Sequence, residues 1–186
     1  MRITQDEQEE RRRKMIYTAY NLFCEHGIDN VSVIQLAKAT GISRNTFFRY
    51  FEHKAQLVLC TQIILWEEIS QHILVESQRQ MQTAKNGYEK VCIILNGFKS
   101  LYYEHSEYIL FSADYKLFLI RNHITLSQRE KDSIEPTVRN TLLAALEEGQ
   151  ADGTINKDRT PTEQLYVMWG ILRGYLSETV VYDKIY

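Results

Sequence analysis

Residues 16–58 read IYTAYNLFCEHGIDNVSVIQLAKATGISRNTFFRYFEHKAQLV. Within them, two short segments with helical periodicity, 33–40 and 44–51, stand on either side of a Gly-Ile-Ser turn. Ser32 and Ser43 each precede one segment, at the position where a hydroxyl caps the first backbone N–H groups of a helix. Two short helices joined by a tight, glycine-containing turn form a helix-turn-helix. The sequence therefore predicts this motif near the N-terminus.

The second predicted helix has an apolar face and a polar face. Phe47 and Phe51 are four residues apart, so they share one face, which we expect to pack inward. The other side chains suit DNA, because arginine binds guanine, asparagine binds adenine and hydroxyls reach phosphates. Lys54 begins the next helix and is placed to neutralise a phosphate. The alternative is a helical hairpin whose polar face is simply solvated. The outward residues are Arg44, Asn45, Thr46, Arg49 and Tyr50.

The same stretch resembles the N-terminal domain of the TetR family of bacterial transcriptional regulators. The likeness contains no gaps, and many fixed positions agree at once. The matching positions are Ala19, Leu22, Phe23, Gly27, Ser32, Val33, Leu36, Ala37, Gly41, Ile42, Ser43, Thr46, Phe47, Tyr50, Phe51 and Lys54.

This resemblance implies an all-α fold. A three-helix, helix-turn-helix DNA-binding domain at 1–53 would precede a helical effector-binding and dimerisation domain at 54–186. It also implies a ligand-responsive regulator, usually a repressor, that binds a palindromic operator in double-stranded DNA as a homodimer and is released by a small-molecule effector. The DNA-binding residues expected on this basis are Ser32, Ser43, Arg44, Asn45, Thr46, Arg49, Tyr50 and Lys54.

Three positions depart from the family's usual pattern. Val31 replaces a common threonine, Ile34 a common polar or basic residue, and Phe48 a usual tyrosine. Each departure removes a potential phosphate contact. The basic cluster Arg11–Lys14 offers compensation by reaching a phosphate or an adjacent groove, and a solvated helix is its other explanation. The departures keep a second function open, in which the protein is an adaptor or co-regulator that binds a protein partner instead of DNA.

Helical periodicity continues through the rest of the chain, and no segment alternates convincingly with period two. Charge divides unevenly: residues 1–60 hold nine Lys/Arg and seven Asp/Glu, whereas the remainder holds thirteen and seventeen. A mildly basic head on an acidic body is typical of a DNA-binding module joined to a domain that does not bind DNA. The further helices that we expect span 6–26, 54–82, 88–103, 106–122, 127–150 and 162–182.

A two-fold symmetric DNA reader requires a dimer, because its two recognition helices must lie about 34–36 Å apart on the duplex. The last predicted helix suits this role, since two glycines spaced by four allow another helix to approach closely. We expect the last two helices of each subunit to form a four-helix interface, and the alternative is that the same stripe is intramolecular core. The interface residues expected are Leu142, Leu146, Leu165, Trp169, Gly170, Leu172, Gly174 and Leu176.

The middle of the chain is rich in aromatic residues. Such a stripe is usually core, but an effector pocket also needs a largely apolar cavity with a few polar groups. The pocket walls that we expect are Trp66, Tyr102, Phe111, Tyr115 and Trp169.

Other classes of protein lack support in the sequence. We predict no enzyme and no catalytic residue, because no glycine-rich phosphate loop, HExxH pair or nucleophile elbow occurs. Three dispersed cysteines without a CxxC pair and five scattered histidines predict no metal site, and no cofactor is expected. No apolar run approaches the ~18 residues of a membrane span, and no signal-peptide segment follows the charged N-terminus. We therefore expect a cytoplasmic bacterial protein, nucleoid-associated when bound, without a membrane partner.

Overall fold

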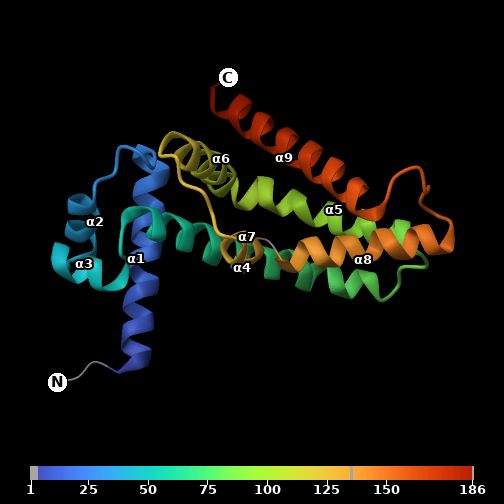
Figure 1. Ribbon diagram of the computed structural model, residues 1–186. Coiled ribbons are helices and arrows are strands. Elements are labelled where there is room, and N and C mark those ends of the chain that lie inside the picture. Colours follow the sequence, from blue (N-terminus) through green and yellow to red (C-terminus); the bar gives the residue numbers. More distant parts are fainter. Residues whose placement is uncertain (1–3, 135, 186) are drawn as a thin grey trace. The chain divides into compact units, whose positions relative to one another are not determined.

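The computed structural model describes residues 4–134 and 136–185, and within these ranges the chain forms helices and no strand (Figure 1). This confirms the all-α fold. The helices in chain order are α1 (Gln5–His26), α2 (Val33–Thr40), α3 (Arg44–Tyr50), α4 (Lys54–Met81), α5 (Gly87–Glu104), α6 (Ser106–Arg121), α7 (Gln128–Ser133), α8 (Pro136–Asp152) and α9 (Pro161–Ile185).

The expected helices match the observed ones closely, except over 127–150. The sequence pattern predicts one helix there, whereas the structure has α7 and then α8. Pro136 explains the break, because proline lacks a backbone N–H and disfavours helical conformation in the residue before it. Accordingly α7 ends at Ser133, and the backbone of the following residue, Ile134, is extended. Residue 135 lies outside the described residues.

The chain divides into two compact units. The first contains Met1–Ile64 and Leu110–Thr125, so α1, α2 and α3 share a unit with most of α6. Its core is built from residues that are fully buried, and aromatic rings supply much of the volume. The larger members are Ile16, Phe23, Ile28, Leu36, Phe47, Phe51, Leu57, Phe111, Tyr115 and Phe118.

The second unit contains Leu65–Ile109 and Leu126–Tyr186. In it α5 packs on α8, and α8 packs on α9 (Figure 1). Gly87 and Gly149 set the closest approach of α5 to α8, because a Cβ atom on Gly87 would lie 2.0 Å from the backbone nitrogen of Gly149. Glycine is therefore required at this crossing. None of the helices described is long and apolar enough to cross a membrane.

Candidate nucleic-acid interface

The turn between α2 and α3 is fixed by local hydrogen bonds. Ser32 caps α2: its hydroxyl accepts a hydrogen bond from the N–H of Gln35 at 3.2 Å, and the Gln35 side chain accepts one from the N–H of Ser32 at 2.8 Å. Gly41 ends α2 with φ of +70°, in the left-handed region that glycine adopts without strain. The N–H of Ile42 then donates to the carbonyl of Ala37 at 3.0 Å. These bonds make the sharp turn that a helix-turn-helix needs.

Helix α3 presents its polar residues outward, as its spacing predicts. Phe47 and Phe51 are each only 1% exposed, and they anchor the inner face of this segment in the core. Arg44, Asn45 and Arg49 are exposed, so their side chains are accessible to a ligand. Thr46 and Tyr50 are half-buried at one edge of the exposed surface and lie on the side toward α1.

A hollow of about 300 Å³ lies between α1 and the helix-turn-helix. Arg11 and Lys14 of α1 line it together with Thr46 and Tyr50 of α3. Two cationic side chains thus share a hollow with two hydroxyl groups, and both groups are hydrogen-bond donors to phosphate oxygens. This juxtaposition supports a phosphate contact for Arg11 and Lys14, which the sequence could also explain as a solvated helix face.

The other arginines of the basic cluster are used differently. The guanidinium of Arg12 donates to Sγ of Cys60 at 3.0 Å and lies over the ring of Phe51, 5.5 Å from its centre. Burial raises the pKa of the Cys60 thiol, and Arg12 offsets part of that effect. Arg12 is therefore a structural residue that joins α1 to the start of α4. Arg13 is exposed and does not line the hollow.

Three of the residues expected to contact DNA also have structural roles. The hydroxyl of Ser43 accepts a hydrogen bond from the N–H of Thr46 at 3.1 Å and caps α3, much as Ser32 caps α2. Lys54 is half-buried, and its ammonium donates to the carbonyl of Asp29 at 3.4 Å. Burial lowers the pKa of Lys54, and the carboxylates of Asp29 and Asp114 oppose that shift.

Helix α6 holds the loop between α1 and α2 in place. The carboxylate of Asp29 accepts hydrogen bonds from Arg121 and Asn122, each at 3.1 Å. Burial raises the pKa of Asp29, but these two bonds outweigh it and keep the pKa below its ordinary value. The ring of Phe111 stacks on Phe23 with centres 6.2 Å apart. The entry to α2 is therefore braced by a segment distant in sequence, which sequence reasoning did not foresee.

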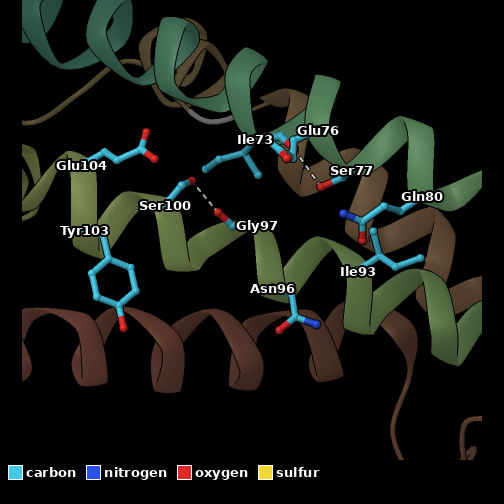
Figure 2. Close-up of a pocket in the computed structure, with 10 residues that line it drawn as sticks. All are labelled: Ile73, Glu76, Ser77, Gln80, Ile93, Asn96, Gly97, Ser100, Tyr103 and Glu104. Carbon is cyan, nitrogen blue, oxygen red and sulfur yellow. Dashed lines mark hydrogen bonds between the residues drawn. The ribbon is translucent and has the colours of Figure 1, made fainter.

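The residues expected to wall an effector pocket are divided between the two units. Phe111 and Tyr115 are core residues of the first unit. Trp66 and Trp169 meet edge to face in the second unit, with ring centres 6.2 Å apart, and Tyr102 there donates a hydrogen bond to Asp183. A separate cavity of about 330 Å³ lies in the second unit between α4 and α5 (Figure 2). Sequence reasoning missed it, because its lining residues are mainly polar.

The residues expected at a dimer interface also divide into two groups. Leu142, Leu146, Leu165 and Leu176 are buried within the subunit, so they have little area left for a partner. Their stripe is intramolecular core, which was the alternative reading. Trp169 and Leu172 are half-buried, whereas Gly170 and Gly174 are exposed and no other atom lies within 4 Å of where their Cβ atoms would be. Tyr166, Ile171 and Tyr175 of α9 are also exposed, on the wide side of the helix that includes these two glycines.

Comparison with known proteins identifies the N-terminal region. Residues 16–60 match the family described as bacterial regulatory proteins of the tetR family. This segment of the chain is similar to that family. The match contains the loop braced by α6, the whole helix-turn-helix and the start of α4. No curated protein matches the sequence.

Solved structures share the fold over nearly the whole chain. The fatty acid degradation regulator FadR from Bacillus halodurans is 19% identical with a TM-score of 0.65, and the alignment covers 100% of this chain and 89% of that one. FadR from Bacillus subtilis in complex with stearoyl-CoA is 18% identical with a TM-score of 0.63, covering 94% and 89%. AibR in complex with isovaleryl coenzyme A and operator DNA is 18% identical with a TM-score of 0.60, covering 90% and 86%. At these identities the likeness shows a common fold.

Proposed function

We propose that this TetR-family regulator is a ligand-responsive repressor that binds a palindromic operator as a homodimer. In this proposal residues 1–53 form the DNA-binding domain and residues 54–186 form the effector-binding and dimerisation domain. The observation that carries it is the hollow in which Arg11 and Lys14 meet Thr46 and Tyr50, beside the exposed polar face of α3. Cations and hydroxyls at the edge of a short polar helix suit a phosphate backbone flanking a major groove.

The exposed residues of α3 would read the bases. Arg44, Asn45 and Arg49 are accessible and carry the side chains that pair with guanine and adenine edges. Arg11, Lys14, Thr46 and Tyr50 would position the helix on phosphates. Three further residues stay candidate phosphate contacts, namely Ser32, Ser43 and Lys54. Unlike the residues above, each of them already forms an intramolecular hydrogen bond with the backbone.

The homodimer would form through α9 together with α8. Tyr166, Ile171 and Tyr175 are each more than 60% exposed, although they are large and apolar or aromatic. An apolar strip of this kind on a helix is typical of a surface that another protein covers. Gly170 and Gly174 keep the middle of the strip flat, so that a partner helix can approach closely. A second copy of the same strip is the occupant that a two-fold operator demands.

A small molecule bound in the second unit would control release from DNA. Two proteins with this fold were solved with acyl-coenzyme A ligands, stearoyl-CoA in one case and isovaleryl coenzyme A in the other. Helix α4 supplies Lys54 to Ile64 to the first unit and continues into the second as far as Met81. An effector that binds one conformation of α4 more tightly shifts the population toward it, by as much as its differential affinity allows. We also propose a cytoplasmic location, because a bacterial regulator must reach its operator DNA.

The experiment that tests this function is selection of bound fragments from a bacterial genome, followed by fluorescence anisotropy at two salt concentrations. We expect a palindromic site whose affinity falls steeply with salt, because phosphate neutralisation releases counterions. Absence of any sequence preference or salt dependence would contradict the proposal. That result would favour the adaptor, which one observation supports: Ile34 and Phe48 expose apolar surface on the helix-turn-helix.

A further inference from the structure

We propose that the cavity between α4 and α5 binds a small organic cation, an alkyl ammonium or diamine, and not an acyl-coenzyme A. The inference deepens the proposed function, because it names the chemical class of the effector, and it rests on that function for the effector's role. The cavity measures about 330 Å³, and every residue that lines it belongs to the second unit. A volume of this size suits a ligand of a few heavy atoms to a dozen.

The charge of the lining is one-sided. Glu76 of α4 and Glu104 of α5 contribute carboxylates, and none of the described residues that line the cavity is lysine or arginine. Arg79 and Lys99 lie on the same two helices but outside the lining. An acyl-coenzyme A carries several phosphate charges, which proteins neutralise with arginine, lysine or a helix N-terminus. Two carboxylates without a lysine or arginine in the lining oppose such a ligand and attract a cation.

The hydroxyl groups in the cavity point to the same class of ligand. Ser77 is only 2% exposed, and its hydroxyl donates to the carbonyl of Ile73 at 2.7 Å. Ser100 likewise donates to the carbonyl of Gly97 at 2.7 Å. Figure 2 shows both bonds within the space between the two helices. Since each hydroxyl has a single proton, both oxygens are left as acceptors toward the cavity. With the carboxylates of Glu76 and Glu104, these two oxygens add acceptors to a lining that also holds the amides of Gln80 and Asn96. The lining can therefore accept hydrogen bonds from a ligand that donates them.

The cavity also has an apolar part that would contact a carbon chain. Ile73 and Ile93 lie between the helices in Figure 2, beside Ser77 and Gly97. At Gly97 the helices approach so closely that a Cβ atom would lie 2.7 Å from Cγ2 of Ile73. Glycine at this position therefore lets α5 come close to Ile73 of α4 at one side of the cavity. Acceptor oxygens around two isoleucines fit methylene groups that end in an ammonium.

The histidine His72 lies beside one of the two carboxylates that line the cavity. Nε2 of His72 lies 3.9 Å from a carboxylate oxygen of Glu104, and both side chains are exposed. A protonated His72 would compete with the ligand's ammonium for this carboxylate.

The test is calorimetric titration of the intact protein, without DNA, with α,ω-diamines of two to eight carbons. Matching diols and dicarboxylates, together with isovaleryl coenzyme A, serve as probes of the wrong charge. We expect at least one diamine to bind at least about tenfold more tightly than its diol, a ratio that corresponds to roughly 1.4 kcal/mol. Absence of diamine binding, or equal binding of a diol, a dicarboxylate or the acyl-coenzyme A, would overturn the assignment.

Titration of glutamine variants with the same diamines tests whether the diamine binds in this cavity. Glu76→Gln and Glu104→Gln should each weaken diamine binding about tenfold, because a charge-assisted hydrogen bond is lost. Glu147→Gln makes the same change of charge on the exposed surface of α8 and should leave diamine binding unaltered. Both lining glutamates are exposed, so circular dichroism should show folded variants. If the two lining variants bind like Glu147→Gln, the cavity is not the site. A chain that binds diamine but no operator would overturn the proposed function and leave this assignment standing.

Discussion

The carboxylate of Asp114 accepts a 2.7 Å hydrogen bond from the backbone N–H of Ile28, a residue 86 positions earlier in the chain. Ile28 is fully buried and follows the glycine that ends α1. Because Ile28 lies after the end of α1, no carbonyl of the described helices accepts a hydrogen bond from its N–H. The carboxylate of Asp114 in α6 supplies the acceptor. With Asp29 bound to Arg121 and Asn122, this contact ties α6 to the loop between α1 and α2 within the first unit.

Removing the Asp114 carboxylate should destabilise the protein. Asp114→Ala leaves the buried N–H of Ile28 without its acceptor, which typically costs about 1–3 kcal/mol. Asp114→Asn keeps an oxygen at the same place and should cost less than half as much. Urea unfolding followed by circular dichroism measures both changes. Equal losses in the two variants would mean that the charge beside Arg121, and not the hydrogen bond to Ile28, is what stabilises the loop.

The cap of α3 should contribute to stability independently of DNA. Ser43→Ala removes the acceptor for the N–H of Thr46 and should lower the free energy of unfolding by about 1 kcal/mol. Ser43→Gly should cost only a few tenths of that, because glycine is tolerated at an N-cap. Thermal unfolding without DNA gives both values. A Ser43→Ala variant as stable as the parent would show that the cap is dispensable and that Ser43 matters only for DNA.

The hollow beside α3 should hold DNA phosphates. Each phosphate contact contributes about 0.9 to the slope of log affinity against log salt concentration. The double change Arg11→Gln and Lys14→Gln should therefore reduce the slope by about 1.8 and weaken all sequences alike. Arg13→Gln is the matched control on the same helix, since it does not line the hollow. Anisotropy titrations at several salt concentrations provide the slopes, and an unchanged slope in the double variant would exclude these two contacts.

The exposed strip on α9 should be the dimer interface. Ile171→Glu places a charge on the strip, next to Gly170 and one turn before Gly174, and should weaken dimerisation at least about a hundredfold, which is roughly 2.7 kcal/mol. Gln82→Glu adds the same charge at an exposed position just after α4 and should leave the dimer intact. Sedimentation velocity at micromolar concentration distinguishes them. A parent protein that is already monomeric would refute the interface at once.

Local sequence was sufficient for the helices and for the turn of the motif. Ser32, Gly41 and Ser43 define the bounds of α2 and α3 through bonds within a few residues, and the four-residue spacing of Phe47 and Phe51 predicts the inner face of this segment. Where the prediction joined α7 to α8, it gave helical periodicity more weight than Pro136. Such features could be read from the sequence because their causes are short-range.

The roles of individual side chains depended on long-range packing. In the sequence of α1, Arg11, Arg12 and Lys14 cannot be told apart by role. In the folded chain Arg12 donates a hydrogen bond to Cys60, whereas Arg11 and Lys14 line the hollow beside α3. By itself the sequence determined an all-α protein with a helix-turn-helix, because capping and periodicity act over a few residues. Only the tertiary structure decided which leucines of α8 and α9 are core, which face of α9 is exposed, and that α4 and α5 line a cavity with two carboxylates and no lysine or arginine among its described residues. The physical reason is that burial and charge environment are set by neighbours that are distant in the chain.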